Sequence, residues 1–364
     1  MTRPATMNAI VLTGHGGMDK LEWHDDWPAP QPSATQVLIK VAATGMNNTD
    51  VNTRAGWYSK AVTQATTGEA YDTVGDDDGT WGGSGISFPR IQGADVCGTV
   101  VAAGADADQS LIGKRVITDN WLRNWDDPLN KNSTGYYGSE ADGGFAQYAV
   151  IDHRNVAAIN SPLTDAELAT FSCSYSTAEG MLARAQVKFG DRVLITGASG
   201  GVGSALIQLA NRRGAITIAM ASTAKHSDVA ALCPDHILDR APENLAAALK
   251  ETTGHDKVDV VCDIVAGPYF PTLIEQIERG GHYATSGAIA GPIVELDVRT
   301  LYLQDLTFHG STVVEPQIFR DLVGYIEAGE LKPVLAATYP LRDFHAAQQA
   351  FIDKKHTGNI VVIP

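Results

Sequence analysis

The stretch that decides the fold of the second half of the chain is Val193-Leu194-Ile195-Thr196-Gly197-Ala198-Ser199-Gly200-Gly201-Val202-Gly203. An apolar run typical of a strand ends in this glycine-rich turn, and apolar residues at helical spacing follow it as far as Gly214. Glycines let the backbone approach a pyrophosphate closely, and the N–H groups at the start of the helix bind the anion. We therefore predict a dinucleotide site at Ser199, Gly200, Gly201 and Val202. A tight turn without a ligand is the alternative, but the flanking strand and helix favour the site.

The composition is typical of a globular protein. The length of 364 residues is enough for two domains with cores of their own. Of these residues, 44% are hydrophobic and 19% are charged, as in ordinary globular proteins. A net charge of −15 argues against nucleic acid or an anionic membrane surface as a partner. Met1-Thr2-Arg3-Pro4 lacks the apolar core of a signal peptide, and no apolar run reaches transmembrane length. The four cysteines show no CxxC spacing, so we expect a cytoplasmic protein without disulfides.

Two patterns of strands divide the chain. The first part alternates short apolar strands with turns, which is typical of a β-rich, barrel-like domain. Its predicted strands are 9–12, 36–41, 98–101 and 145–150. From Pro162 onwards, predicted strands alternate with helical stretches, as in a doubly wound parallel sheet. Those strands are 193–195, 216–221, 236–239, 258–264, 283–286 and 306–310, followed by a helix at 318–328 and a strand at 360–363.

The segment 59–87 breaks this regularity. It is rich in Gly and Thr, shows little periodicity and holds three adjacent carboxylates, Asp76, Asp77 and Asp78. A loop of this length inside a compact domain is usually functional or disordered. Three adjacent carboxylates cannot all turn toward one cation, so we predict a solvated loop rather than a cation site.

The end of the second predicted strand, 216–221, indicates which nucleotide binds. An NAD site carries an acidic residue there for the ribose hydroxyls, and this strand has none. Instead Ser222, Thr223 and Lys225 follow it, two hydroxyls and a cation that suit a 2′-phosphate. The sequence therefore predicts NADPH. Helix capping by Ser222 or Thr223 is an alternative that is compatible with phosphate binding.

Several motifs resemble those of the medium-chain dehydrogenase/reductase superfamily, over essentially the whole chain. They are Gly45-Met46-Asn47-Asn48-Thr49-Asp50-Val51, Arg54-Ala55-Gly56-Trp57-Tyr58, Gln92-Gly93-Ala94-Asp95-Val96-Cys97-Gly98, Asp142-Gly143-Gly144-Phe145-Ala146, Gly280-Gly281-His282-Tyr283-Ala284-Thr285-Ser286-Gly287 and Gly358-Asn359-Ile360-Val361-Val362. The resemblance implies an α/β protein of two domains. A GroES-like β-barrel catalytic domain would span 1–159 and 315–364, and a Rossmann NADPH-binding domain with a doubly wound parallel sheet would span 160–314.

Within the superfamily the chain resembles the zinc-free quinone oxidoreductase and enoyl reductase branch. Zinc alcohol dehydrogenases have a cysteine where Asn47 stands and a His-Glu pair where Ala94-Asp95 stands. Cys173 falls near the position of their third ligand, and a lone thiol is only a buried apolar residue, because catalytic zinc normally has three protein ligands. The resemblance therefore implies a site without metal.

The same resemblance assigns residues near the nicotinamide. Thr177 should lie beside it, while Val265, Ser286 and Gly287 should line the cofactor cleft. For Thr177, a role as an N-cap or as a hydroxyl within a helix is equally open.

Two further residues are predicted to contact the substrate. Tyr58 follows an Arg-x-Gly-x-Tyr pattern that in some relatives places a tyrosine beside the substrate, where it would donate a hydrogen bond or a proton to the enolate. The alternative for Tyr58 is an amphipathic surface tyrosine paired with Trp57. Asn47 could donate its amide to the substrate oxygen, or Asn47 and Asp50 could simply hold their turn.

These observations predict an NADPH-dependent reductase of small molecules that carry an activated double bond or a quinone. Without a Lewis-acid metal, such substrates are better hydride acceptors than a plain carbonyl, because the charge delocalises onto oxygen. A non-catalytic NADPH-binding protein and a zinc-free alcohol dehydrogenase are the alternatives. We also expect a homodimer, formed by edge-to-edge pairing of the strand near 306–312 with its symmetry mate.

Overall fold

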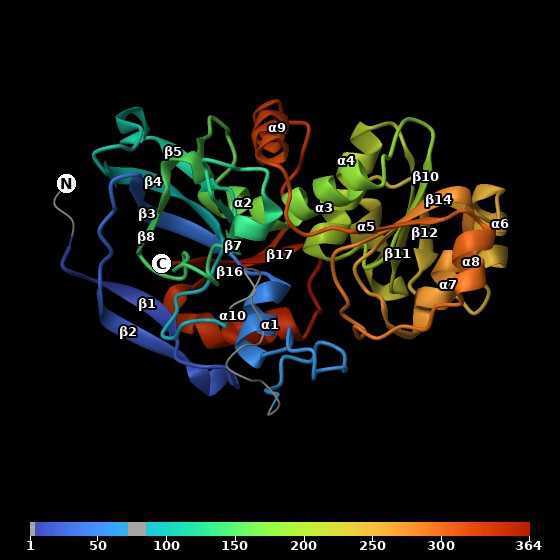
Figure 1. The fold of residues 1–364 in the computed structure, drawn as a ribbon, viewed down its shortest axis with the longest axis horizontal. Helices are drawn as coiled ribbons and strands as arrows, with labels where there is room; N and C mark the ends of the chain where they lie inside the picture. Colours follow the sequence, from blue (N-terminus) through green and yellow to red (C-terminus); the bar gives the residue numbers. More distant parts are fainter. Residues whose placement is uncertain (1–3, 72–84) are drawn as a thin grey trace. The chain divides into compact units, whose positions relative to one another are not determined.

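The computed structural model describes residues 4–71 and 85–364 and divides the chain into two units (Figure 1). Unit 1 comprises Met1–Val62, Thr67–Cys173 and Glu315–Pro364, and unit 2 comprises Thr63–Thr66 and Ser174–Val314. Asp76 to Asp78, for which the sequence predicts a solvated loop, lie outside the described residues. In the described part of the chain, no helix combines the length and the apolar character that crossing a bilayer requires.

The boundary between the units differs from the expected one at two places. Residues 160–173 were expected in the second domain but belong to unit 1, because hydrogen bonds attach them to its strands. The Asn359 amide donates to the carbonyl of Thr170 at 2.6 Å, and the N–H of Cys173 donates to Asp95 at 2.9 Å. Residues 63–66 belong to unit 2, where the N–H of Thr66 donates to the carbonyl of Ile289 at 3.0 Å.

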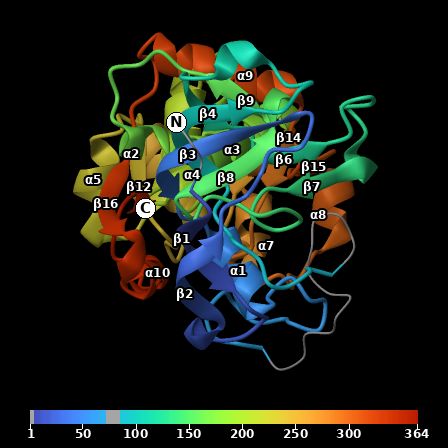
Figure 2. The same cartoon turned by 90° about the vertical axis from the view of Figure 1, so that its left-hand side faces the viewer.

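Unit 1 is a GroES-like domain built on a seven-stranded sheet in the order β16-β17-β3-β4-β5-β9, with β8 also paired to β3. Figure 2 shows β3 with its neighbours β4 and β8. Two small sheets, β1-β2 and β6-β7, complete its strands. The strands are β1 (Thr6–Leu12), β2 (Leu21–Pro28), β3 (Gln36–Gly45), β4 (Asp95–Ala103), β5 (Arg115–Thr118), β6 (Trp121–Arg123), β7 (Thr134–Tyr136), β8 (Tyr148–Asp152), β9 (Val156–Ala158), β16 (Leu335–Pro340) and β17 (Asn359–Ile363). The helices are α1 (Asn48–Ala55), α2 (Asp165–Leu168), α9 (Pro316–Glu327) and α10 (Phe344–Ile352).

Apolar strand residues of unit 1 form its core, as the sequence predicts. Alternate residues of β3, Val37, Ile39 and Val41, pack against Val96 and Val100 of β4. One predicted strand is displaced: the strand expected at 145–150 lies at β8, two to three residues further along the chain. The reason is burial, because Phe145 is fully buried and packs edge-on against Phe344, with the ring centroids 4.7 Å apart.

Unit 2 is a parallel Rossmann-like sheet in the order β12-β11-β10-β13-β14-β15. This is the order of a doubly wound sheet, with the crossing point between β10 and β13. Its strands are β10 (Arg192–Ile195), β11 (Ile216–Ala221), β12 (His236–Asp239), β13 (Val258–Asp263), β14 (Ile277–Thr285) and β15 (Thr307–Gly310). The helices are α3 (Ser172–Arg184), α4 (Gly201–Arg212), α5 (His226–Ala230), α6 (Leu245–Thr253), α7 (Phe270–Glu275) and α8 (Val298–Leu303).

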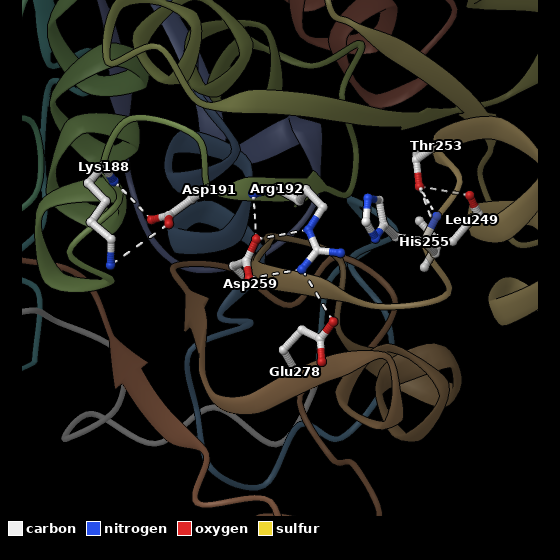
Figure 3. A network of polar contacts seen from close by, with 8 residues as sticks. All are labelled: Lys188, Asp191, Arg192, Leu249, Thr253, His255, Asp259 and Glu278. Atoms are coloured by element: carbon white, nitrogen blue, oxygen red, sulfur yellow. Dashed lines mark hydrogen bonds and ion pairs between the residues drawn. The ribbon is translucent and has the colours of Figure 1, made fainter.

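Polar contacts tie together the amino ends of three strands of this sheet (Figure 3). The guanidinium of Arg192, the first residue of β10, contacts Asp259 of β13 at 3.0 Å and Glu278 of β14 at 3.2 Å. The Asp259 carboxylate also accepts the backbone N–H of Arg192 at 2.8 Å. These contacts lower the pKa of Asp259 and lie at the edge of the sheet opposite the glycine-rich turn.

Candidate functional site

The glycine-rich turn joins β10 to α4 as the sequence predicts. The chain leaves β10 through Gly197, whose φ of +59° favours glycine, and Gly200 caps α4 in an extended conformation. A Cβ on Gly203 would collide with the carbonyl of Gly197, so only glycine allows this close packing of helix on turn. Ser199, Gly200, Gly201 and Val202 are partly exposed around the first N–H groups of α4. This backbone cradle at the start of a 12-residue helix fits a pyrophosphate.

Asp263, the last residue of β13, fixes the loop that follows this strand. Its fully buried carboxylate accepts the hydroxyls of Thr196 at 2.5 Å and Tyr283 at 2.6 Å, so it joins the ends of β10, β13 and β14. It also accepts the N–H groups of Val265 at 2.8 Å and of Ala266 at 3.1 Å. Asp263 therefore holds Val265 at the carboxyl edge of the sheet. Sequence reasoning missed this residue, whose only signal is an acid at the end of an apolar strand.

Three of the residues expected around the nicotinamide, Val265, Ser286 and Gly287, follow strands β13 and β14 at this same carboxyl edge. Val265 reaches the turn, since a Cβ on Gly197 would lie 3.3 Å from its Cγ2 atom. Ser286 and Gly287 follow β14, and Gly287 passes close to Ile264, where a Cβ would lie 3.0 Å from the Ile264 carbonyl. Thr177 lies inside α3 and is partly exposed, so an N-cap role does not apply to it.

The end of β11 carries the predicted phosphate ligands. Ser222 precedes the short 3₁₀ helix Thr223–Lys225, and its hydroxyl makes no capping hydrogen bond to that turn. Lys225 is partly buried, and burial lowers the pKa of its ammonium group while Asp228 raises it. Thr223 has a partner that sequence reasoning missed: its hydroxyl donates to Asp239 of the neighbouring strand β12 at 3.2 Å.

Unit 1 holds a buried polar cluster around Asp95, the first residue of β4. The Asp95 carboxylate accepts the amide of Asn47 at 3.0 Å, the amide of Asn120 at 2.8 Å and the N–H of Cys173 at 2.9 Å. The hydroxyl of Tyr136 donates to the Cys173 thiol at 3.1 Å. Cys173 is therefore not simply an apolar buried residue: it is only half-buried and belongs to a hydrogen-bonded network. The described residues contain no group of three His, Cys, Asp or Glu side chains placed to hold a metal ion.

Asn47 stabilises the turn at the start of α1, in addition to any role toward a substrate. Its backbone N–H donates to Asp50 at 2.7 Å, and its side-chain amide donates one hydrogen to Asp95. Asp50 is buried at the start of α1, and burial together with the nearby charge of Asp95 raises its pKa to about 7. Burial likewise raises the pKa of Asp95 to about 6. Burial therefore brings the pKa values of both carboxyls toward neutral pH.

Tyr58 lies next to this cluster. Helix α1 ends at Gly56, whose φ of +78° reverses the chain and brings Trp57 and Tyr58 back beside it. The Tyr58 hydroxyl bonds to the side chains of Thr49 and Asn52, and burial raises its pKa to about 12, so it remains a donor at neutral pH. The nearby Cys173 and Asp50 side chains raise the pKa of Tyr58 further. Tyr58 and Trp57 contact each other edge-on with their ring centroids 5.6 Å apart, which is the pairing expected in the alternative for this tyrosine.

Asp50 makes the stability of the protein depend on pH. Its folded-state pKa of about 7 lies above the ordinary aspartate pKa of 3.8. The contribution of Asp50 to the free energy of unfolding is therefore complete below pH 4 and is lost as the pH rises through 7. The loss amounts to about 2–4 kcal/mol. We expect Asp50→Asn to reduce the fall in melting temperature between pH 5 and pH 8 by about 3–5 °C. Scanning calorimetry measures this, with exposed Asp256→Asn as the matched control. Equal pH dependence in wild type and Asp50→Asn would contradict the assignment.

Comparisons with known proteins agree with this geometry. The family model described as "Alcohol dehydrogenase GroES-like domain" matches residues 33–161, and "Zinc-binding dehydrogenase" matches residues 201–328. The quinone oxidoreductase of Pongo abelii is 25% identical over 98% of both chains. The chloroplastic NADPH-dependent alkenal/one oxidoreductase of Arabidopsis thaliana is 27% identical over 99% of this chain and 80% of its own.

One solved structure is more similar to this chain in sequence than these two relatives are. A proposed alcohol dehydrogenase of Sinorhizobium meliloti 1021 is 43% identical, covers 100% of this chain and 98% of its own, and superposes with a TM-score of 0.90. The matched models cover both units of the fold. The chain therefore belongs to the medium-chain dehydrogenase/reductase superfamily and, within it, to the branch of quinone and enoyl reductase-like proteins.

Proposed function

We propose that this oxidoreductase is NADPH-dependent and zinc-independent and that it reduces an activated double bond or a quinone. One observation carries the proposal: a dinucleotide turn occurs together with a buried cluster in which Asn47, Asn120 and Cys173 surround Asp95. Amide groups that donate to a carboxylate do not form the three-ligand set that catalytic zinc needs. The names of the quinone and alkenal relatives support the same class of substrate.

The residues of unit 1 suit a substrate whose oxygen gains negative charge. When bound, the nicotinamide supplies a hydride to the electrophilic carbon. The phenol of Tyr58 stays protonated at neutral pH and can donate to the developing enolate. Asn47 has a second amide hydrogen to offer, because only one is used on Asp95. Asp95 orients that amide, and the Asp50 carboxyl, with a pKa of about 7, can hold a proton nearby.

The preference for NADPH rests on Ser222, Thr223 and Lys225. We expect NADPH consumption with enones or quinones, weaker activity with NADH, and no stoichiometric zinc on elemental analysis. A charged contact to phosphate is worth about 1.5–3 kcal/mol, so Lys225→Ala should raise the KM for NADPH roughly tenfold or more and barely change NADH kinetics.

Lys250→Ala, which removes an exposed lysine of α6, is the matched control for charge. Equal use of both nucleotides by the wild type would contradict the preference. Cofactor binding without turnover on any enone or quinone would favour a non-catalytic NADPH-binding protein, and alcohol-dependent NADP reduction would favour a zinc-free alcohol dehydrogenase.

Tyr58→Phe tests the proposed donor. The substitution keeps the ring and its contact with Trp57 but removes the hydroxyl. Donors of this kind are worth about 10²–10³ in rate, so kcat should fall by roughly that factor while NADPH affinity stays within twofold. Tyr339→Phe, at a partly exposed tyrosine of β16, is the control. Wild-type turnover in Tyr58→Phe would leave Tyr58 as part of the pocket wall only.

We also propose that the protein is a homodimer through unit 2. Strand β15 lies at the end of the sheet order and so has one open edge, and α8 directly precedes it in the chain. Large apolar side chains are exposed on and before α8, which is unusual for a free surface. They are Ile293, Val294, Leu296, Val298, Tyr302 and Leu303. Pairing of β15 with its symmetry mate would bury both features.

Light scattering at micromolar concentration should therefore give the mass of a dimer. Val298→Asp should shift the protein toward the monomer, because it places a charge in the apolar patch. Leu129→Asp replaces an equally exposed apolar residue in unit 1 and should leave the dimer intact. A monomeric wild type, or dissociation by both substitutions alike, would rule out this interface.

A further inference from the structure

A carboxylate lies at the predicted phosphate site, although β11 itself carries none. In the parallel register of the sheet, Ala221 at the end of β11 pairs with Asp239 at the end of β12. Asp239 is exposed, and its Oδ1 atom accepts the hydroxyl of Thr223 at 3.2 Å. Ala221 and Asp239 are distant along the chain, and only the pairing of β11 with β12 brings them together. The third strand of the predicted nucleotide-binding fold, β12, therefore supplies the acidic residue that the second strand, β11, lacks.

Both signs of charge surround this position. Lys225 lies two residues after Thr223 in the same 3₁₀ turn, and Asp228 acts on the Lys225 ammonium group. The imidazole Nε2 of His226 lies 3.1 Å from the carbonyl of Ala221. The side chain of Arg240, next to Asp239, is exposed. A phosphate at this strand end would be attracted by Lys225 and repelled by Asp239.

We propose that Asp239 is a specificity-determining residue that opposes binding of the 2′-phosphate and so narrows the preference for NADPH over NADH. This inference rests on the proposed function, which assigns that phosphate to the end of β11. Asp239 acts in two ways. Its negative charge repels a phosphate group, and its Oδ1 atom takes the Thr223 hydroxyl hydrogen that would otherwise be donated to the phosphate.

The two effects have different signatures. Repulsion between exposed charges is screened by salt, because the Debye length shrinks from about 10 Å at 0.1 M to about 3 Å at 1 M. The hydrogen bond from Thr223 is a local effect that depends on its hydroxyl and far less on salt. Removing the carboxylate therefore increases affinity for the 2′-phosphate in a partly salt-dependent way, and the increase requires Thr223.

The experiment measures the Kd of the full chain for NADPH, NADH and 2′,5′-ADP by calorimetry. We expect Asp239→Asn to bind NADPH and 2′,5′-ADP about three- to tenfold more tightly at 0.05 M salt, with a smaller gain at 0.5 M salt. The Kd for NADH should stay within twofold. The control, Asp256→Asn, changes the net charge equally but lies in the loop before β13, at the opposite edge of the sheet.

Thr223→Val completes a double-mutant cycle with Asp239→Asn. Thr223→Val should weaken NADPH binding less in the wild type than in the Asp239→Asn background, because in the wild type the Thr223 hydroxyl is already bound to Asp239. In the Asp239→Asn background it should reverse part of the gain. Melting temperatures of all variants confirm that each is folded.

Three results would overturn the inference. The first is an unchanged Kd for NADPH in Asp239→Asn, and the second is an equal gain in Asp256→Asn. The third is weaker NADH binding without any gain for NADPH, which would make Asp239 an acceptor for the ribose hydroxyls instead. A wild type that binds neither nucleotide would overturn the proposed function and this inference with it, whereas the other outcomes leave the proposed function standing.

Discussion

Unit 2 depends on one buried carboxylate, that of Asp263. It accepts hydroxyls from β10 and β14 and two backbone N–H groups from the loop after β13, so it joins three strands at the edge that carries the glycine-rich turn. Ala266 in that loop has a φ of +52°, a conformation that costs about 1–3 kcal/mol for a non-glycine residue. The hydrogen bond from its N–H to Asp263 stabilises this conformation. Asp263 therefore both positions this loop and stabilises its strained conformation.

Unit 1 uses a buried carboxylate in a similar way but for different chemistry. Asp95 collects two side-chain amides and one backbone N–H, which fixes Asn47 and Asn120 beside the half-buried Cys173. A carboxylate with three donors is satisfied without a metal, because each of its hydrogen bonds replaces water that burial removes. Burial is the largest influence on both carboxyls of the cluster and raises the pKa of Asp95 to about 6 and that of Asp50 to about 7. The cluster therefore combines a fixed group of donors with two carboxyls whose pKa values lie near neutral pH.

The sequence predicts well what local patterns determine. The turn at Gly200 to Gly203 and the strands of the parallel sheet follow from glycine spacing and apolar runs, and the structure has them at or near the expected positions. The displaced strand β8 shows the limit, because Phe145 is apolar but is buried by ring packing outside the ladder. The roles of Asp263 and Asp95 could not be predicted, because their partners lie on other strands. Such contacts depend on register between elements, which no pattern within one element contains.

The end of β11 shows why cofactor preference cannot be assigned from a single strand. An acidic residue after the second strand indicates NAD because of where it places a negative charge in space. The chain can supply a charge at that place from an adjacent strand instead. In a parallel sheet, neighbouring strands end at the same edge about 4.8 Å apart, so the last residues of β11 and β12 act on one ligand position. Under this proposal, Lys225 and Asp239 contribute to phosphate binding with opposite signs. The proposed preference for NADPH is then the difference between these two electrostatic interactions, and either residue can change it while the fold stays the same.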